Sequence, residues 1–290
     1  MRKSETSDLW WKSAVVYCLD IEKYFDANDD GVGDMLGLAQ RIDYYGVDPR
    51  LGTHGDLVEL IRTAKDRGMR VIADLVLNHT SHMHPWFKSA RSSKEGPYRD
   101  FYVWRDEPPT DTSDDVAFPD EETSLWAFEE KTGQYYLHNF YTEQPDLNIA
   151  NPKVQEQIAK IIGFWLQVGL DGFRVDAVPF FIEDRGLPQQ WCELYGDPHE
   201  YLRELKAFMG RRRGDAIFLG EVNVHYKDQV EFFGGAEGDE LTMMIDFELM
   251  QRMYLALARQ DAAPMVQTLR RRPTLAGTAS SPTSCATMTS

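Results

Sequence analysis

The stretch DGFRVDAV at residues 171–178 places an arginine and an aspartate inside an otherwise apolar run. In a strand, successive side chains point to opposite faces, so Phe173 and Val175 share one face while Arg174 and Asp176 share the other. Burying such a charged pair is costly unless the site uses it. The pattern therefore predicts a buried strand that carries a functional acid.

The segments around this strand predict an alternation of strands and helices. Asn151 suits an N-cap and Pro152 a first helical position. In the segment 55–68 the apolar residues have helical spacing. Such alternation indicates a parallel α/β sheet or barrel. We expect strands at 14–20, 69–79, 216–222 and 241–247, helices at 36–45, 55–68, 151–169, near 198–212 and at 248–259, and an apolar helix face made of Leu57, Leu60, Ile61 and Ala64.

Residues 80–145 differ from this alternation. They contain PW, GP, PP and FP dipeptides, an acidic stretch and many aromatic residues. This composition predicts a loop-rich subdomain inserted after the strand at 69–79.

The composition predicts a globular protein and argues against nucleic acid or an anionic membrane as a partner. The 290 residues include 31 basic and 47 acidic side chains, a net charge of −16, which disfavours polyanionic partners. The N-terminus lacks an apolar signal core, and Cys18, Cys192 and Cys285 lack metal-like spacing. We expect a cytoplasmic location with no disulfide framework; the oligomeric state stays open.

Polar groups cluster where the predicted strands end: Asn78 with His79, Arg174 with Asp176, and Glu221. In a (β/α)8 barrel these ends form the active-site face. Two facing carboxylates are what glycoside hydrolysis requires. Arg174 would keep Asp176 ionised, and the apolar residues before Glu221 would raise its pKa. Each acid alone suits an ordinary strand end; the combination favours catalysis.

Four ordered motifs carry a family resemblance: DLVLNH (74–79), QPDLN (144–148), GFRVDAV (172–178) and GEV (220–222). With their spacing, they resemble the α-amylase family of glycoside hydrolases over roughly residues 10–275. The resemblance implies an α/β fold, a (β/α)8 TIM barrel, and a retaining reaction through a covalent glucosyl-enzyme.

The resemblance also assigns roles to individual residues. It implies Asp176 as nucleophile, Glu221 as general acid/base and Arg174 as the group that orients Asp176. His79 and Gln144 would bind sugar hydroxyls, and Asp74 would be mainly structural.

Within the family, SHMHPWF (81–87), YRDFYVWRDEPP (98–109), GQYYLHNFYTEQPDLN (133–148) and DAVPFFIE (176–183) are most similar to trehalose synthases. These enzymes interconvert maltose and trehalose, so the resemblance implies a small α-glucoside substrate such as maltose. Oligosaccharide α-glucosidases or α-amylases of the family are an alternative. A non-catalytic fragment that at most binds sugar or calcium is another. Aromatic residues of the inserted region would mostly form its core.

The loop DANDDGVGD (26–34) has the alternating oxygen ligands of a calcium loop and a glycine at its sixth position. It lacks the glutamate of an EF-hand, and a solvated acidic turn is the alternative. The family resemblance implies a second site. We expect structural Ca²⁺ and no organic cofactor, with the candidate ligands Asp26, Asn28, Asp30, the Val32 carbonyl and Asp34 in the first site, and Asn78, Asp146, the carbonyls of Phe180 and Phe181, and Glu183 in the second.

Two departures from the family pattern predict an incomplete barrel. RIDYYGVDPRLG (41–52) runs across the place of the second strand, where about two dozen residues are missing by the size of a βα unit. The Ser/Thr-rich tail 277–290 stands where the seventh strand and its NHD motif are expected, which indicates a frameshift and a disordered tail. We expect strands two, seven and eight to be missing, activity to be low, and the parts to be 1–79 (barrel), 80–145 (insert), 146–276 (barrel) and 277–290 (tail).

Overall fold

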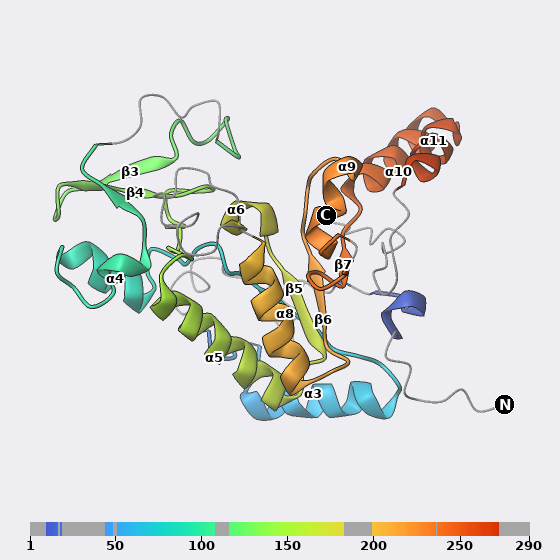
Figure 1. The fold of residues 1–290 in the computed structure, drawn as a ribbon, viewed down its shortest axis with the longest axis horizontal. Coiled ribbons are helices and arrows are strands. Elements are labelled where there is room, and N and C mark those ends of the chain that lie inside the picture. The colour runs from blue at the N-terminus through green and yellow to red at the C-terminus, as the bar shows by residue number, and fades with distance from the viewer. Residues whose placement is uncertain are drawn as a thin grey trace, which may run out of the picture.

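A computed structural model describes residues 10–16, 18, 44–48, 51–107, 116–182, 199–235 and 237–272. Helices and strands alternate through most of these ranges (Figure 1). In chain order the elements are η1 (Trp10–Ser13), α3 (His54–Asp66), β1 (Ala73–Leu75), α4 (Pro85–Ser92), η2 (Arg99–Phe101), β2 (Trp104–Arg105), β3 (Trp126–Glu129), β4 (Gln134–Leu137), α5 (Pro152–Val168), β5 (Gly172–Val175), α6 (Val178–Ile182), α8 (Glu200–Arg212), β6 (Ile217–Gly220), α9 (Tyr226–Gln229), η4 (Glu231–Phe233), β7 (Met243–Met244), α10 (Phe247–Arg259) and α11 (Ala263–Arg271).

A parallel sheet of four strands organises the molecule, in the order β1-β5-β6-β7. All three pairings are parallel, so the four carboxyl ends share one edge. The register places Val175 beside both Leu75 and Gly220. The parallel sheet is thus confirmed, but each strand is shorter than expected. The strands expected at 69–79, within 171–178, at 216–222 and at 241–247 are confined to Ala73–Leu75, Gly172–Val175, Ile217–Gly220 and Met243–Met244.

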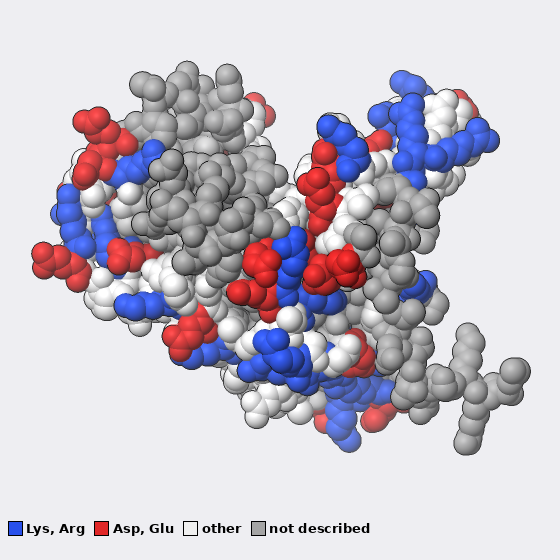
Figure 2. Space-filling view, in the orientation of Figure 1, with Lys and Arg blue, Asp and Glu red and all other residues white. Residues whose placement is uncertain are grey.

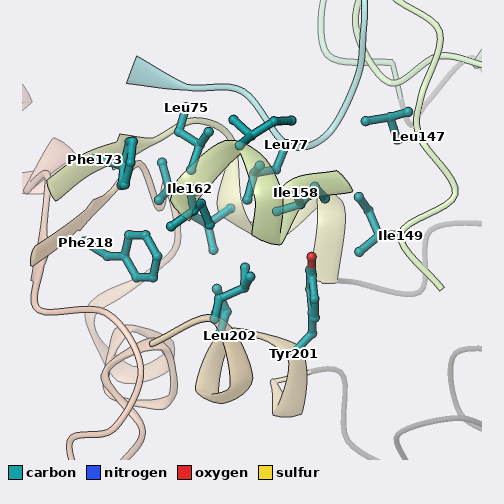
Figure 3. Close-up of a cluster of buried hydrophobic side chains, with 14 of the residues drawn as sticks. Leu75, Leu77, Leu147, Ile149, Ile158, Ile162, Phe173, Tyr201, Leu202 and Phe218 are labelled. Atoms are coloured by element: carbon teal, nitrogen blue, oxygen red, sulfur yellow. The ribbon is translucent and has the colours of Figure 1, made fainter. Parts of the chain in front are cut away.

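The two faces of this sheet bury different residues because side chains alternate along each strand. Phe173 and Phe218 point toward α5 and α8, where they meet Ile158, Ile162 and Leu202 (Figure 3). Full burial of each such side chain contributes about 1.5–3 kcal/mol. The other face carries a smaller cluster, whose buried members are Trp11, Ile217, Leu219, Met243 and Ile245. Arg174 lies on this second face, as the alternation requires.

The helix starts follow from local sequence. The side chain of Asn151 accepts a hydrogen bond from Lys153 N at 2.9 Å, and Pro152 follows it, as expected for α5. Thr53 caps α3 through a reciprocal bond with Asp56, a capping box that the sequence reading missed. The predicted apolar face of α3 is wrong at Leu60, which is 57% exposed.

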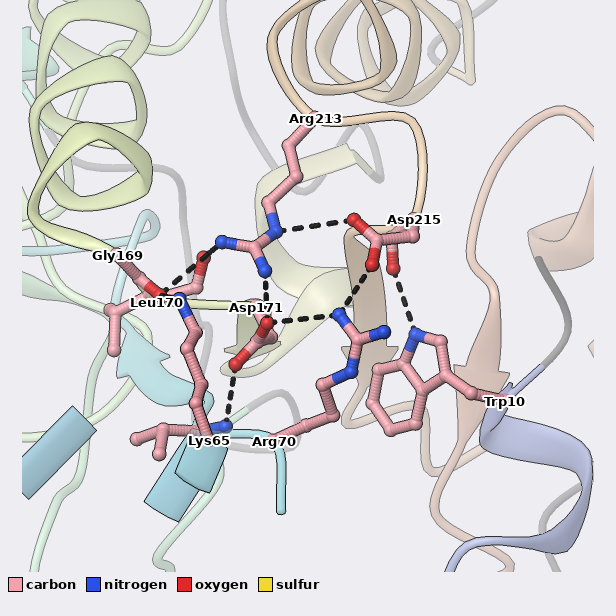
Figure 4. Close-up of polar contacts among 9 residues, drawn as sticks. Trp10, Lys65, Arg70, Gly169, Leu170, Asp171, Arg213 and Asp215 are labelled. Carbon is pink, nitrogen blue, oxygen red and sulfur yellow. Dashed lines mark hydrogen bonds and ion pairs between the residues drawn. The ribbon is translucent and has the colours of Figure 1, made fainter. Parts of the chain in front are cut away.

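The amino ends of the sheet strands are joined by a charged network (Figure 4). The carboxylate of Asp171 is fully buried and pairs with Arg70 at 3.1 Å and with Arg213. It also accepts the N–H of Val71 at 2.9 Å. Trp10 donates its indole N–H to the carbonyl of Asp215 at 2.9 Å, which attaches η1 to the same network. This network lies at the end of the sheet opposite the strand carboxyl ends.

Between β1 and α5 the chain forms α4 and a separate antiparallel sheet in the order β2-β4-β3. Phe87, Tyr102 and Tyr136 pack edge to face at ring separations of 5.0 Å and are buried. This region returns to the parallel sheet where Leu147 N–H donates to the carbonyl of Asn78 at 2.8 Å. Its last residues therefore lie beside the carboxyl end of β1.

The helices α10 and α11 pack on each other and project from the rest of the chain (Figure 1). Figure 2 shows Lys and Arg side chains gathered over them, and their arginines are Arg252, Arg259, Arg270 and Arg271. The acidic excess of the chain is therefore not spread evenly. No helix within the described ranges is long and apolar enough to cross a membrane.

Several predicted segments lie outside the described residues, among them 26–34, 183–198 and 273–290. Of the strand expected at 14–20, residues 14–16 and 18 are described and none of these is in a strand. The helix expected at 36–45 is wrong at its end, because Tyr44 and Tyr45 form a turn. The Tyr44 hydroxyl instead bonds the carbonyls of Val76 and His79 at 3.3 and 3.2 Å, and its own carbonyl accepts the indole N–H of Trp165 at 2.7 Å.

Candidate active site

Asp176 and Glu221 follow directly on two neighbouring strands. Val175 pairs with Gly220 in the β5–β6 ladder, so the next residue of each strand leaves the sheet at the same level. The backbone continues this pairing, since Glu221 N–H donates to the carbonyl of Val175 at 2.9 Å. Asp176 N–H donates to the carbonyl of Leu75 on the other side, at 3.1 Å. The parallel sheet therefore brings the two acids together.

Arg174 lies at the centre of this group. Its Nη1 is 2.6 Å from Oδ1 of Asp176 and 3.3 Å from Oδ1 of Asp74, and its Nη2 contacts the carboxylate of Glu221. The side chains of Arg174, Asp176 and Glu221 are 26%, 22% and 28% exposed, while that of Asp74 is 64% exposed. One cation thus faces three carboxylates at a partly open surface.

Burial raises the pKa of Glu221 to about 7, and a hydrogen bond with the Asp176 carboxyl acts in the same direction. Arg174 opposes this shift because it favours the ionised form. A carboxyl group that keeps its proton near neutral pH can serve as a general acid. In retaining glycosidases the two carboxyls lie roughly 5 Å apart on either side of the bond that is cleaved, and here Arg174 contacts both acids.

His79 lies four residues beyond β1 and is partly buried. Burial lowers its pKa to about 4, so the imidazole is neutral at pH 7. The ring packs against Phe140 at 5.3 Å, and its buried Nδ1 has no hydrogen-bond partner among the described residues. A neutral ring with an unused nitrogen suits a hydroxyl group of a ligand.

Gln144 lies in the turn that follows β4. Its side-chain oxygen accepts a hydrogen bond from Tyr141 N at 3.3 Å. The next residue, Pro145, accepts the N–H of Thr80 through its carbonyl at 3.1 Å. The structure therefore places the segment of Gln144 beside the segment of His79, with the Gln144 amide oxygen engaged within its own turn.

The described part of the second expected metal site centres on Asp146, which is 2% exposed. Its Oδ1 accepts from Asn78 Nδ2 at 3.0 Å, and the Asn139 side chain donates to its other oxygen. Burial raises the pKa of Asp146 well above its usual value. Asn139 was not a predicted site residue, because only the fold brings it here.

The remaining predicted metal ligands lie outside the described residues or show no metal-binding arrangement within them. Glu183 and residues 26–34 lie outside the described chain. Phe180 donates its N–H to the carbonyl of Ala177 at 3.0 Å, and its ring lies 4.8 Å from that of Phe140. Across the described ranges, no three His, Cys, Asp or Glu side chains converge on a common metal position.

Two surface pockets of the described chain lie away from the carboxylates. One of about 530 Å³ runs between α5 and α8 and includes Tyr201 and Phe208. The other, of about 310 Å³, lies beside β2 and includes Arg99 and Trp104. Neither is lined by Asp176 or Glu221, so we place the chemistry at the strand ends, where charge and burial converge.

Comparison with known proteins gives a consistent pattern. The family model for the alpha amylase catalytic domain matches residues 40–276. The trehalose synthase/amylase TreS of Mycobacterium tuberculosis (strain H37Rv) is 37% identical over 295 residues, covering 91% of this chain and 49% of that protein. Oligo-1,6-glucosidase of Halalkalibacterium halodurans is 34% identical and covers 83% and 50%.

Among solved structures, a variant of the trehalulose synthase MutB aligns with a TM-score of 0.74 and 32% identity. The alignment covers 90% of this chain and 55% of that one. The chain thus spans about half the length of the curated relatives that it matches.

Proposed function

The chain belongs to the α-amylase family, and on that premise we propose that it is a retaining glycoside hydrolase or transglucosylase that acts on α-linked glucosides. The observation that carries this proposal is the pair Asp176 and Glu221, bridged by Arg174 at the ends of neighbouring parallel strands. The raised pKa of Glu221 supports its role as the acid.

In the first step, Asp176 attacks the anomeric carbon while Glu221 donates its proton to the glycosidic oxygen. The bond between the anomeric carbon and that oxygen breaks, and a β-glucosyl ester forms on Asp176. Glu221, now ionised, removes a proton from water or from a sugar hydroxyl. That oxygen displaces Asp176, and the α-configuration is restored.

Arg174 and His79 support this chemistry in different ways. Arg174 contacts Asp176 at 2.6 Å and holds its carboxylate in place. Its positive charge also favours ionised Glu221 after the proton has been transferred. His79 is neutral and would donate or accept one hydrogen bond with a sugar hydroxyl, with Gln144 as a second polar contact.

We propose maltose as the representative substrate, with trehalose as the transfer product. Relatives named trehalose synthase support this choice. A relative named oligo-1,6-glucosidase supports the alternative, hydrolysis of longer α-glucosides. We also propose that the barrel is incomplete at its second, seventh and eighth strands, so that a non-catalytic fragment is the alternative of another class. The cytoplasmic location remains a prediction.

A calcium ion at Asp146 is part of the proposal. The buried carboxylate is surrounded by amide donors from Asn78 and Asn139 and has no ion pair within the described chain. A bound cation would compensate its charge, and Asn78 and Asp146 would supply oxygen ligands. The role of this ion would be structural, since it would join the end of β1 to the region before α5.

The test is incubation of the purified chain with maltose, followed by separate measurement of trehalose and free glucose. Trehalose with little glucose supports transfer, and glucose alone supports hydrolysis. An Asp176→Asn variant that is equally folded should give neither product. If the unaltered chain, soluble and folded, also gives neither, the fragment alternative holds.

A further inference from the structure

Ala177 connects the end of β5 to α6 with a left-handed backbone, at φ 48°. Residues other than glycine adopt this conformation rarely, because the Cβ atom is crowded. We propose that Ala177 is a positioning residue that sets the place of Glu221 relative to Asp176, an inference that rests on the function proposed for this pair.

The backbone of this turn meets Glu221. Val178 N–H donates to the Glu221 carbonyl at 3.1 Å, and the backbone N–H of Ala177 lowers the pKa of the Glu221 carboxyl. On the other side, Glu221 N–H donates to Val175 at 2.9 Å. Both the side chain and the main chain of the acid are therefore held by the residues on either side of Asp176.

Asp176 itself is held by different partners. Its N–H donates to Leu75 on β1, and its carboxylate contacts Arg174 at 2.6 Å. The left-handed conformation of Ala177 directs consecutive N–H groups toward two different strands. The N–H of Asp176 faces β1, whereas the N–H groups of Ala177 and Val178 face Glu221. A regular continuation of β5 would direct alternate N–H groups to opposite sides of the strand.

The surroundings fix this conformation. Ala177 is 7% exposed and Val178 is fully buried, and the Ala177 carbonyl accepts the N–H of Phe180 at 3.0 Å. Strained backbone persists only where packing and hydrogen bonds determine it, and it occurs preferentially at active sites. Glycine would adopt this φ without crowding but would also gain other conformations, so alanine restricts the turn.

The test is the Ala177→Gly variant, because glycine can adopt the observed φ. We expect kcat with maltose to fall about tenfold while KM stays within about twofold, because looser placement affects the reacting groups more than substrate binding. In the variant the backbone N–H of residue 177 stabilises ionised Glu221 less, so the pKa of Glu221 should rise. The alkaline limb of the pH profile should therefore move to higher pH. Ala207→Gly, at an exposed position of α8, is the matched control and should change neither kcat nor KM.

A second measurement is independent of turnover. The carboxyl carbon of Glu221, assigned with a Glu221→Gln variant, is titrated by ¹³C NMR in the unaltered chain and in Ala177→Gly. A higher midpoint in the variant supports positioning even if the chain forms no product, in which case only the proposed function fails. An unchanged midpoint overturns the inference, and so does an unchanged kcat where the chain is active.

Discussion

Nη1 of Arg174 lies 2.6 Å from Oδ1 of Asp176, on the face of β5 opposite Phe173 and Val175. The same guanidinium contacts Glu221 on the next strand. A charged pair inside an apolar strand is thus accommodated at the rim of the sheet, where Arg174 stays 26% exposed and joins both candidate catalytic groups. The cost of burial is reduced by partial hydration and by paired charges.

Replacing the acid should separate the two steps of the proposed reaction. Glu221→Gln removes the proton donor, so we expect turnover of maltose to fall about 10²- to 10⁴-fold. Azide needs no general base and should react with the glucosyl ester on Asp176. The product, identified by NMR, should be α-glucosyl azide, since two displacements retain the configuration.

The matched control for this experiment is Asp176→Gly with azide. Without the nucleophile, azide can attack the substrate directly, and one displacement gives β-glucosyl azide. Finding the β-product with Glu221→Gln would contradict the assignment of Asp176 as nucleophile.

The activity should depend on pH through Glu221. With its pKa raised to about 7, Glu221 is the protonated acid below that pH and loses its proton above it. We expect kcat/KM for maltose to decline above pH 7, approaching about tenfold per pH unit. A flat profile between pH 6 and 9 would exclude Glu221 as the acid.

The same shift has a consequence for stability. The folded state holds the Glu221 proton more tightly than the unfolded state, whose pKa is near 4.5. The contribution of this group to folding is therefore fully present below pH 4.5 and is lost as the pH rises through 7. Thermal unfolding of Glu221→Gln should depend less on pH over this range.

Much of the site was predictable because strand ends are local features. The apolar runs before Arg174, Glu221 and His79 end in polar groups, and parallel strands necessarily bring those ends together. The start of α5 was predictable for the same reason, since Asn151 and Pro152 act on adjacent backbone.

What the sequence did not reveal depends on contacts that only the folded chain makes. The turn after β4 brings Asn139 to Asp146, and Asp171 meets Arg70 and Arg213 across more than 40 residues. Leu60 has helical spacing with Leu57 and Ala64 but is 57% exposed, so periodicity alone misplaced it.

The Asp171 network should be important for stability. Asp171→Ala leaves Arg70 and Arg213 without their shared buried partner, and we expect a loss of about 3 kcal/mol in the free energy of unfolding. Glu59→Ala removes an exposed ion pair with Arg62 and should leave the free energy of unfolding almost unchanged. Urea unfolding of both variants measures this difference, and equal losses would show that the network contributes no more than a surface pair.

Calcium should stabilise the chain if it binds at Asp146. We expect the Tm to rise with added Ca²⁺ and to fall after chelation, by mass action on the folded state. Asp146→Asn keeps the shape of the side chain but removes the charge, so its Tm should no longer respond to Ca²⁺ at this site. A response that Asp146→Asn leaves unchanged would place the ion elsewhere.

The close approach of β5 and β6 should make Gly172 indispensable. Its φ is 151°, and a Cβ atom there would lie 2.2 Å from the carbonyl oxygen of Ile217. Gly172→Ala must push the two strands apart beneath Asp176 and Glu221, so we expect a loss of about 2–4 kcal/mol in the free energy of unfolding.

Gly210→Ala in α8 is the matched control. Apart from its chain neighbours and the backbone of its own helix, no atom lies within 4 Å of the added Cβ, and helix propensity predicts a gain of about 0.5–1 kcal/mol. Urea unfolding measures the change in the free energy of unfolding for both variants. An unchanged value for Gly172→Ala would show that the two strands can separate without loss of stability.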